Sequence, residues 1–297
     1  MTSFNDMLQA KFDEGKSVCV GLDPDITKLP LPHLSLNPQE INLIENWQGM
    51  GSRESAATAI VRFNERIVDA TCDLVCAYKP NSAFYERIGW NGMRALERTV
   101  AYIRRKDPTI PIIYDAKRGD IGNTNAGYAE LAFDVLGVDA ITIAPYMGSE
   151  SLSAFMEYSN KGIIVLVRTS NPGAGEFQDL DVEDGKEKLY ETVARHVAEK
   201  WNGNGNCAVV VGATKPEDLA SVRKAVGDMP ILIPGIGAQG GDLEATVSAG
   251  ANSQGQGMII NSSRGVIHAS RHGDFTQAAR KVVEVMNAQI AEVLTRV

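Results

Sequence analysis

The sequence predicts a single-domain (β/α)8 TIM barrel, and three features of the 297-residue chain support that fold class. Short apolar runs rich in Val and Ile recur along the chain, eight in all, and segments of helical periodicity lie between them. Near-continuous apolar strands that alternate with helices are typical of a parallel sheet covered on both faces. Eight such units in a chain of this length fit a closed barrel, and an open doubly wound sheet is the alternative on pattern alone.

Each predicted strand is a run in which apolar residues follow one another almost without interruption. The eight runs span residues 17–23, 73–79, 110–115, 140–145, 162–168, 207–212, 230–235 and 256–261. Periodicity near 3.6 predicts helices between several of these runs and after the last one. These helices span residues 55–71, 92–106, 125–137, 190–201 and 276–294.

Two connections are too long to be plain turns, namely residues 24–54 after the first strand and 169–186 after the fifth. Long loops in compact domains are usually functional or disordered. Both follow the carboxyl end of a predicted strand, which is where a barrel of this kind builds its active site. No internal repeat, low-complexity tract or linker divides the chain, so residues 1–297 are expected to form one domain.

The composition is that of an ordinary globular protein, with 44% apolar residues and 29 Lys+Arg against 37 Asp+Glu. The net charge of −8 argues against a nucleic-acid or anionic-membrane binder, although a local basic pocket remains compatible with a small anionic ligand. The amino-terminal segment lacks a secretory apolar region, and no apolar run reaches the ~18 residues of a membrane span. Four cysteines, Cys19, Cys72, Cys76 and Cys207, make no disulfide framework, so we expect reduced thiols and a cytoplasmic protein.

Charged residues stand at the ends of the first three predicted strands. The first strand ends in Asp23, the second in Lys79, and the third in Asp115, which Lys117 and Asp120 follow. Because positions i and i+2 of a strand point the same way, Asp115 and Lys117 are expected to face one side, beside Lys79. Each opposite-sign contact would be worth about 4 kcal/mol at 4 Å and an effective dielectric constant near 20, before desolvation. The pattern predicts a Lys–Asp–Lys–Asp array in one mouth, with a purely structural ion-pair network as the alternative.

A glycine-rich segment follows the seventh predicted strand, with Gly235, Gly237 and Gly240 in the spacing G-x-G-x-x-G. This spacing resembles a dinucleotide-binding loop, but it does not follow the first strand and no acidic residue follows at the expected distance. We therefore interpret it as a loop whose backbone N–H groups hold a single phosphate. Arg264, just past the eighth strand, could bind the same phosphate in a bidentate way, and a merely solvated Arg264 is the alternative.

The four histidines, His33, His196, His268 and His272, show no metal-ligand spacing, and we interpret them as surface or packing residues. The sequence contains neither a G-x-S-x-G elbow nor a P-loop, and it offers no evident anchor for pyridoxal phosphate or thiamine. We expect no metal and no cofactor. The chemistry is then expected to depend on Lys, Asp and a bound phosphate.

At DAKRGDIGNT (115–124) the chain resembles the orotidine 5′-phosphate decarboxylase family, and within it the longer bacterial subgroup (type 2). Further matching stretches occur in the family's order and at predicted strand ends. They are GLDPD (21–25), YKPNSAFYE (78–86), APYMG (144–148), TSNPGA (169–174), PGIGAQGGD (234–242) and NSSRGV (261–266). The D-x-K-x-x-D motif alone is shared with related decarboxylases and aldolases, and its combination with Lys79 narrows the resemblance.

The resemblance implies decarboxylation of orotidine 5′-phosphate to uridine 5′-phosphate and CO2, the last step of UMP biosynthesis, without metal or organic cofactor. The motif carries the family's catalytic array over to Lys79, Asp115, Lys117 and Asp120. A fixed ammonium beside C6 stabilises the developing carbanion and then protonates it, which is the role that falls to Lys117. Asp115 would lie near the departing carboxylate, and Lys79 would keep Asp115 ionised and contact the ribose.

The resemblance also implies a homodimer with shared active sites, because Asp120 and Thr124 would cross to the partner's site. Asp23 would bind a ribose hydroxyl, and Ser170 would bind the edge of the pyrimidine. The residues that would hold the phosphate are Gly235, Gly237, Gln239 and Arg264.

Two alternatives remain from the sequence. One is a magnesium-dependent decarboxylase or aldolase of a keto-sugar phosphate, which would place an acidic metal ligand where Lys79 stands. The other is a catalytically silent barrel that binds a nucleotide, which would be expected to have lost a member of the charged array. A lysine at position 79 would repel Mg²⁺, and all four charged residues are present.

Overall fold

Eight parallel strands form one sheet in the computed structural model, which describes residues 2–47, 49–182, 184–236 and 241–296. They are β1 Val18–Gly21, β2 Ala77–Lys79, β3 Ile113–Arg118, β4 Ala140–Ile143, β5 Gly162–Arg168, β8 Cys207–Val211, β9 Ile231–Pro234 and β10 Met258–Ser262. Neighbouring strands follow the order β2-β1-β10-β9-β8-β5-β4-β3. Parallel bridges from Tyr78 to Ile112 and from Asn81 to Asp115 join the two end strands. The predicted (β/α)8 barrel is confirmed, and the open sheet is wrong.

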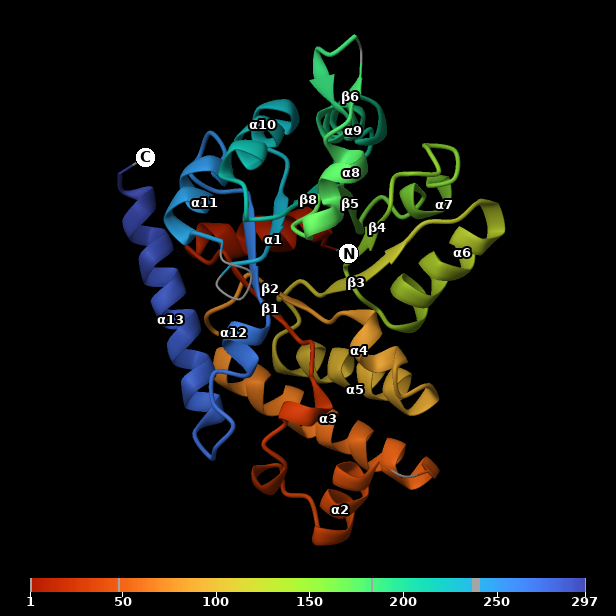
Figure 1. The fold of residues 1–297 in the computed structure, drawn as a ribbon, viewed down its shortest axis with the longest axis vertical. Helices are drawn as coiled ribbons and strands as arrows, with labels where there is room; N and C mark the ends of the chain where they lie inside the picture. The colour runs from red at the N-terminus through yellow and green to blue at the C-terminus, as the bar shows by residue number, and fades with distance from the viewer. Residues whose placement is uncertain (1, 48, 183, 237–240, 297) are drawn as a thin grey trace.

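The longer helices surround this barrel (Figure 1). The helices are α1 Phe4–Asp13, α2 Pro38–Asn46, α3 Gly49–Thr71, α4 Ser82–Glu86, α5 Trp90–Lys106, α6 Gly122–Glu130, α7 Ser153–Met156, α8 Gly175–Gln178, α9 Leu189–His196, α10 Pro216–Val226, α11 Leu243–Gly250, α12 Arg264–Ile267 and α13 Phe275–Leu294. Single π-helical turns, Leu131–Val135 and Val197–Trp201, extend α6 and α9. The five predicted helices are therefore present, although α3 begins at Gly49 and α6 at Gly122. None of the helices in the described ranges is long and apolar enough to cross a membrane.

Apolar side chains form two layers, one between strands and helices and one inside the barrel. The inner cluster takes small and branched side chains from every strand, and three residues of α1, Phe4, Leu8 and Phe12, pack against it. Phe4 lies so close to Gly162 that a Cβ there would approach its ring within 2.4 Å. Helix α1 therefore closes the barrel at the amino ends of the strands, and the opposite end remains available for a ligand.

The two long connections carry structure of their own. Residues 24–54 contain two short 3-10 turns, helix α2 and the start of α3, and α2 lies beyond α3 at one end of the molecule (Figure 1). Residues 169–186 contain a 3-10 turn, Pro172–Ala174, the short helix α8 and strand β6, Asp181–Val182. Strand β6 pairs antiparallel with β7, Glu187–Lys188, in a hairpin that the sequence pattern did not predict.

We expect Phe4→Ala to lower the free energy of unfolding by about 3–5 kcal/mol, because it leaves a cavity under the barrel interior. Phe177→Ala is the matched control, since that ring is 63% exposed and its removal should change stability by about 0.5 kcal/mol or less. Urea denaturation followed by circular dichroism measures both variants. Equal effects in the two variants would contradict the sealing role of α1.

Candidate active site

A cavity of about 520 Å³ lies at the carboxyl ends of the barrel strands, where (β/α)8 barrels carry their active sites. Seven of the residues singled out from the sequence line it: Asp23, Lys79, Asp115, Lys117, Ser170, Gly235 and Arg264. They come from the ends of β1, β2, β3, β5, β9 and β10 or from the residues just beyond them. The closed barrel thus brings together residues that are far apart in the sequence.

Three of the four predicted charges form one hydrogen-bonded cluster. The Asp115 carboxylate accepts from Lys79 Nζ at 2.9 Å through Oδ2 and from Lys117 Nζ at 2.7 Å through Oδ1. Lys79 is only 3% exposed, whereas the Lys117 side chain is 48% exposed and reaches into the mouth of the cavity. One ammonium is therefore fixed in the barrel wall, and the other faces the ligand space.

The backbone of β3 is irregular where it carries this cluster. Lys117 has φ +48°, and the pairing of β3 with β4 shifts register between Tyr114 and Arg118. Asp115 and Lys117 do face the same space, but the reason given from sequence, regular alternation along a strand, is wrong. A lysine in the left-handed region costs of order 1–3 kcal/mol, and such strain concentrates at functional sites.

Two neutral side chains complete the coordination of Asp115. Asn81 Nδ2 donates to Oδ2 at 3.1 Å, and Thr142 Oγ1 donates to Oδ1 at 2.9 Å. Thr142 also accepts from the backbone N–H of Lys117 at 3.0 Å, so it spans the irregular turn of β3. The sequence pattern predicts no role for Asn81 or for Thr142, which lies inside an apolar run. Asn81 follows directly after Lys79 and Pro80, and that position at a strand end was the available signal.

Electrostatic interactions keep the buried pair of Asp115 and Lys79 ionised. Burial opposes the charge on Asp115, but Lys79 and Lys117 hold the pKa of its carboxyl well below its ordinary value. Burial likewise opposes the charge on Lys79, yet Asp115 and then Asp23 raise the pKa of its ammonium above its ordinary value. Asp23 is buried beside them and accepts a hydrogen bond from Asn81 N at 3.2 Å.

Asp120 does not join this mouth within one chain, which corrects the expectation from strand spacing. Its carboxylate accepts from the backbone N–H of Ile121, and the side chain of Asn125 accepts from its own N–H. Neither Asp120 nor the exposed Thr124 belongs to the described lining of the cavity. Strand β3 ends at Arg118, so Asp120 and Thr124 lie past the strand end and outside the described cavity lining.

The opposite wall of the cavity carries the residues predicted to hold a phosphate. Gly235 follows β9 with φ +107°, a conformation that glycine adopts without strain, and Arg264 begins α12 just after β10. Both line the cavity, as do Asn261 and Ser263. Two residues predicted for the same phosphate, Gly237 and Gln239, lie outside the described residues.

The histidines lie away from this chemistry. His268 stacks on Phe63 with ring centroids 5.8 Å apart, and burial lowers its pKa to about 4. His33 and His272 are exposed, and His196 packs edge-on against Trp201. The interpretation of all four as surface or packing residues is confirmed. In the described ranges, no group of three or more His, Cys, Asp or Glu side chains is arranged to hold a metal ion.

The fold and the site together define a (β/α)8-barrel enzyme with a charged Lys–Asp–Lys cluster at the carboxyl ends of its strands. Residues 16–282 match the model of the orotidine 5′-phosphate decarboxylase / HUMPS family. An orotidine 5′-phosphate decarboxylase of Cupriavidus metallidurans is 49% identical over 284 residues, which is 94% of each chain. The chain therefore belongs to the orotidine 5′-phosphate decarboxylase / HUMPS family.

Solved structures show the same similarity. The OMP decarboxylase of Leishmania donovani has a TM-score of 0.78 and 37% identity, and the alignment covers 98% of this chain and 99% of that one. The UMP synthase of the same organism has a TM-score of 0.81 and 40% identity, but the match covers 57% of that chain. The barrel described above is thus the fold of these decarboxylases over almost the whole chain.

We expect Asp115→Asn to destabilise the fold by about 3–5 kcal/mol at neutral pH, because it leaves the buried Lys79 ammonium without its anionic partner. Burial then lowers the pKa of folded Lys79 below its unfolded value, so the unfolded state binds more protons and stability rises with pH. Urea denaturation at neutral and at alkaline pH should show partial recovery in the variant. The unaltered protein should show no such gain, since its folded Lys79 has a raised pKa. A pH-independent loss would contradict the coupling.

Proposed function

We propose that this protein decarboxylates orotidine 5′-phosphate to uridine 5′-phosphate and CO2, the reaction that completes UMP biosynthesis. The observation that carries the proposal is the Lys79–Asp115–Lys117 cluster, which lies on one wall of the cavity opposite Gly235 and Arg264. A substrate with a phosphate at one end and a carboxylate at the other matches this arrangement of charges. Relatives that carry this printed name support the same reaction.

The proposed chemistry needs only groups of this chain at the reacting carbon. The bond from C6 to its carboxylate breaks, CO2 leaves, and the electron pair stays on C6. The Lys117 ammonium stabilises that charge as it develops and then transfers its proton to C6. Because its side chain is half exposed, Lys117 can regain a proton from water after the product leaves. Asp115 lies beside the carboxylate in this pose, and its fixed negative charge favours the departure of CO2.

The remaining lining residues bind the parts of the substrate that do not react. We assign the ribose to Asp23 and Lys79, and the pyrimidine edge to Ser170. The phosphate is assigned to Gly235, Gly237, Gln239 and Arg264. Binding energy from the remote phosphate can be used to position C6 against Lys117, which lowers the barrier.

The magnesium-dependent alternative has no support from the site. Such an enzyme needs an acidic metal ligand where Lys79 stands, and this ammonium is buried and hydrogen-bonded to Asp115. A silent nucleotide-binding barrel is likewise unsupported, because the Lys–Asp–Lys cluster is assembled and ionised. We expect the reaction to proceed without metal or organic cofactor.

We further propose a homodimer with shared active sites. Asp120 and Thr124 lie outside the described lining of the cavity of their own chain, and the proposal assigns them to the site of a second copy. Ile121, next to Asp120 in the chain, and Tyr146, in the loop after β4, carry exposed apolar side chains, which favours a protein contact at these loops. We also infer a cytoplasmic location, since the four cysteines are free thiols as in reducing compartments.

The first experiment follows the near-ultraviolet absorbance of orotidine 5′-phosphate with purified, EDTA-treated protein. We expect rapid loss of orotate absorbance with uridine 5′-phosphate as the product. Lys117→Ala should lower turnover by more than about 10³-fold, since proton transfer and charge stabilisation are lost together, while uridine 5′-phosphate still binds. Lys106→Ala, a half-exposed lysine paired with Asp69, is the matched control and should keep full turnover. Near-normal turnover in Lys117→Ala would remove that residue from its role.

Sharing of active sites can be tested by mixing two inactive variants, Asp120→Ala and Lys79→Ala. In a hybrid dimer, one site would combine Lys79 of one chain with Asp120 of the other, while the second site would lack both. Random exchange should restore about a quarter of the sites. If subunit exchange is demonstrated by mass and activity stays at the level of the separate variants, the sites are not shared.

A further inference from the structure

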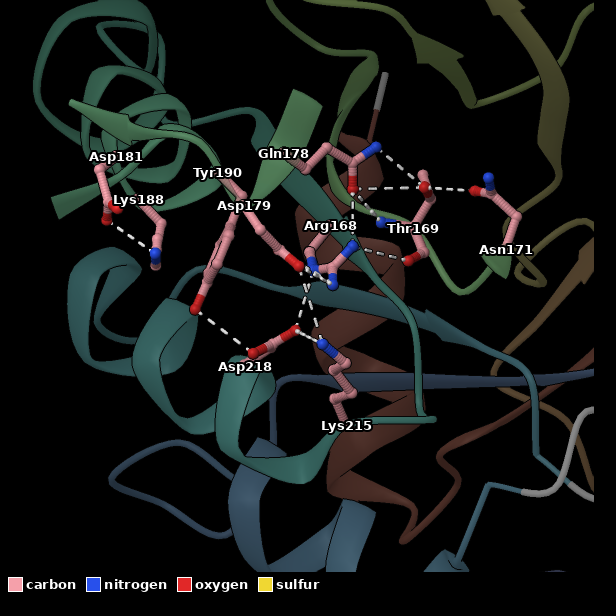
Figure 2. Close-up of polar contacts among 10 residues, drawn as sticks. All are labelled: Arg168, Thr169, Asn171, Gln178, Asp179, Asp181, Lys188, Tyr190, Lys215 and Asp218. Atoms are coloured by element: carbon pink, nitrogen blue, oxygen red, sulfur yellow. Dashed lines mark hydrogen bonds and ion pairs between the residues drawn. The ribbon is translucent and has the colours of Figure 1, made fainter. Parts of the chain in front are cut away.

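A partly buried network of polar side chains gathers around the loop that begins at Thr169 (Figure 2). Its centre is Arg168, the last residue of β5, which is 5% exposed. Arg168 Nε donates to Asp218 Oδ2 at 2.8 Å, and a terminal nitrogen contacts the Asp179 carboxylate at 3.0 Å. Lys215 lies within 4.0 Å of both carboxylates, so two cations face two anions. This balanced cluster has no part in the chemistry proposed above.

The network ties together the two ends of one loop. The loop begins at Thr169 and returns at Gln178 and Asp179. The Gln178 side-chain oxygen accepts from Thr169 N at 2.9 Å, and its NH2 donates to Thr169 Oγ1 at the same distance. Thr169 Oγ1 in turn donates to Asn171 at 2.7 Å. Figure 2 shows this chain of contacts running from Arg168 through Gln178 to Asn171.

Polar contacts hold the ends of this loop, and a hollow lies under part of it. A second hollow of about 250 Å³ lies between residues 168–175 of the loop and the segment that follows β8, which includes Gly212 and Lys215. A close approach lies at Gly212, where an added Cβ would be 2.7 Å from Ser170 Cβ. The two ends of the loop, Thr169 at one side and Gln178 and Asp179 at the other, form its stem. Arg168 and Gln178 position this stem, and the loop touches the barrel closely at Ser170.

The position of the stem determines where Ser170 and Asn171 lie in the cavity. Ser170 and Asn171, which follow the stem directly, line the 520 Å³ cavity together with Lys117 and Asp115. A change of angle at Thr169 moves both residues relative to the barrel, while the walls made by β1, β9 and β10 stay in place. The contacts of a ligand with this loop and with the other walls can thus be separated by experiment.

We propose that Arg168 and Gln178 are positioning residues that clamp the loop 169–179, and that this clamp sets the affinity for the base of the ligand but not for its sugar phosphate. The proposal rests on the proposed function, because it takes Ser170 as the contact to the pyrimidine. The clamp acts through Thr169 on Ser170 and Asn171, and neither Arg168 nor Gln178 touches the substrate in this arrangement.

The test compares two ligands, uridine 5′-phosphate and ribose 5-phosphate, by calorimetry on the full chain. In Gln178→Ala the Kd for uridine 5′-phosphate should rise about tenfold, the size of one lost hydrogen-bonding connection, and the Kd for ribose 5-phosphate should stay within about twofold. Arg168→Lys keeps the positive charge beside Asp218 but loses the planar guanidinium. It should also raise the Kd for uridine 5′-phosphate relative to the Kd for ribose 5-phosphate. Gln178 is neutral and half-buried, so Gln178→Ala keeps the charged cluster intact and the fold is expected to survive.

Lys188→Gln is the matched control, because Lys188 pairs with Asp181 at 2.7 Å in the hairpin of the same connection but outside the stem (Figure 2). It should leave both affinities unchanged. An equal loss for both ligands in Gln178→Ala, or a loss of melting temperature with an unchanged ratio, would overturn the clamp and leave a structural role only. Failure of the unaltered protein to turn over orotidine 5′-phosphate would instead overturn the proposed function, so the two failures are distinguishable.

Discussion

The carboxylate of Asp115 is the group on which the rest of the site depends. Each of its oxygens accepts two hydrogen bonds, Oδ2 from Lys79 and Asn81 and Oδ1 from Lys117 and Thr142. These donors come from three neighbouring segments of the barrel, so the carboxylate links β2, β3 and β4 at their carboxyl ends. A buried charge is tolerated only when it is fully paired in this way. The strands thus hold the charge in place before any ligand arrives, which is the condition for strong electrostatic stabilisation.

The two lysines illustrate how burial divides one residue type into two roles. Lys79 is enclosed and its pKa is raised by Asp115 and Asp23 against the effect of burial, so it acts as a permanent counter-charge. Lys117 contacts the same carboxylate, but half of its side chain meets the cavity. Of the two, Lys117 is the lysine exposed enough to exchange a proton with water. The left-handed backbone at Lys117 and the register shift of β3 lie at the point where the strand carries this ammonium into the cavity.

The sequence pattern was sufficient for all eight barrel strands, because strands buried on both faces need continuous apolar runs. It also placed Asp115, Lys79 and Lys117 together, since the carboxyl ends of parallel strands share one edge. It could not reveal the turn at Lys117 or the role of Thr142, because a threonine in an apolar run has the ordinary composition of a strand. Asp120 was misplaced within the chain for a different reason. Its position was inferred from spacing along a strand, and the strand ends at Arg118.

The order of the strands explains why the proposed contacts to the reacting carbon, phosphate, ribose and base come from different sides of the cavity. Around the closed ring, β1, β3, β5 and β9 are alternate strands, so β3 faces β9 and β1 faces β5 across the cavity. In the proposed pose, Asp115 and Lys117 lie opposite the phosphate contact at Gly235, and Asp23 lies opposite Ser170. Asp23, Asp115 and Gly235 stand at or directly after the ends of their strands. Ser170 stands on the loop 169–179, which the proposed clamp at Arg168 would position. If the proposed clamp holds the base contact, affinity for the base can change without any change to the charged cluster.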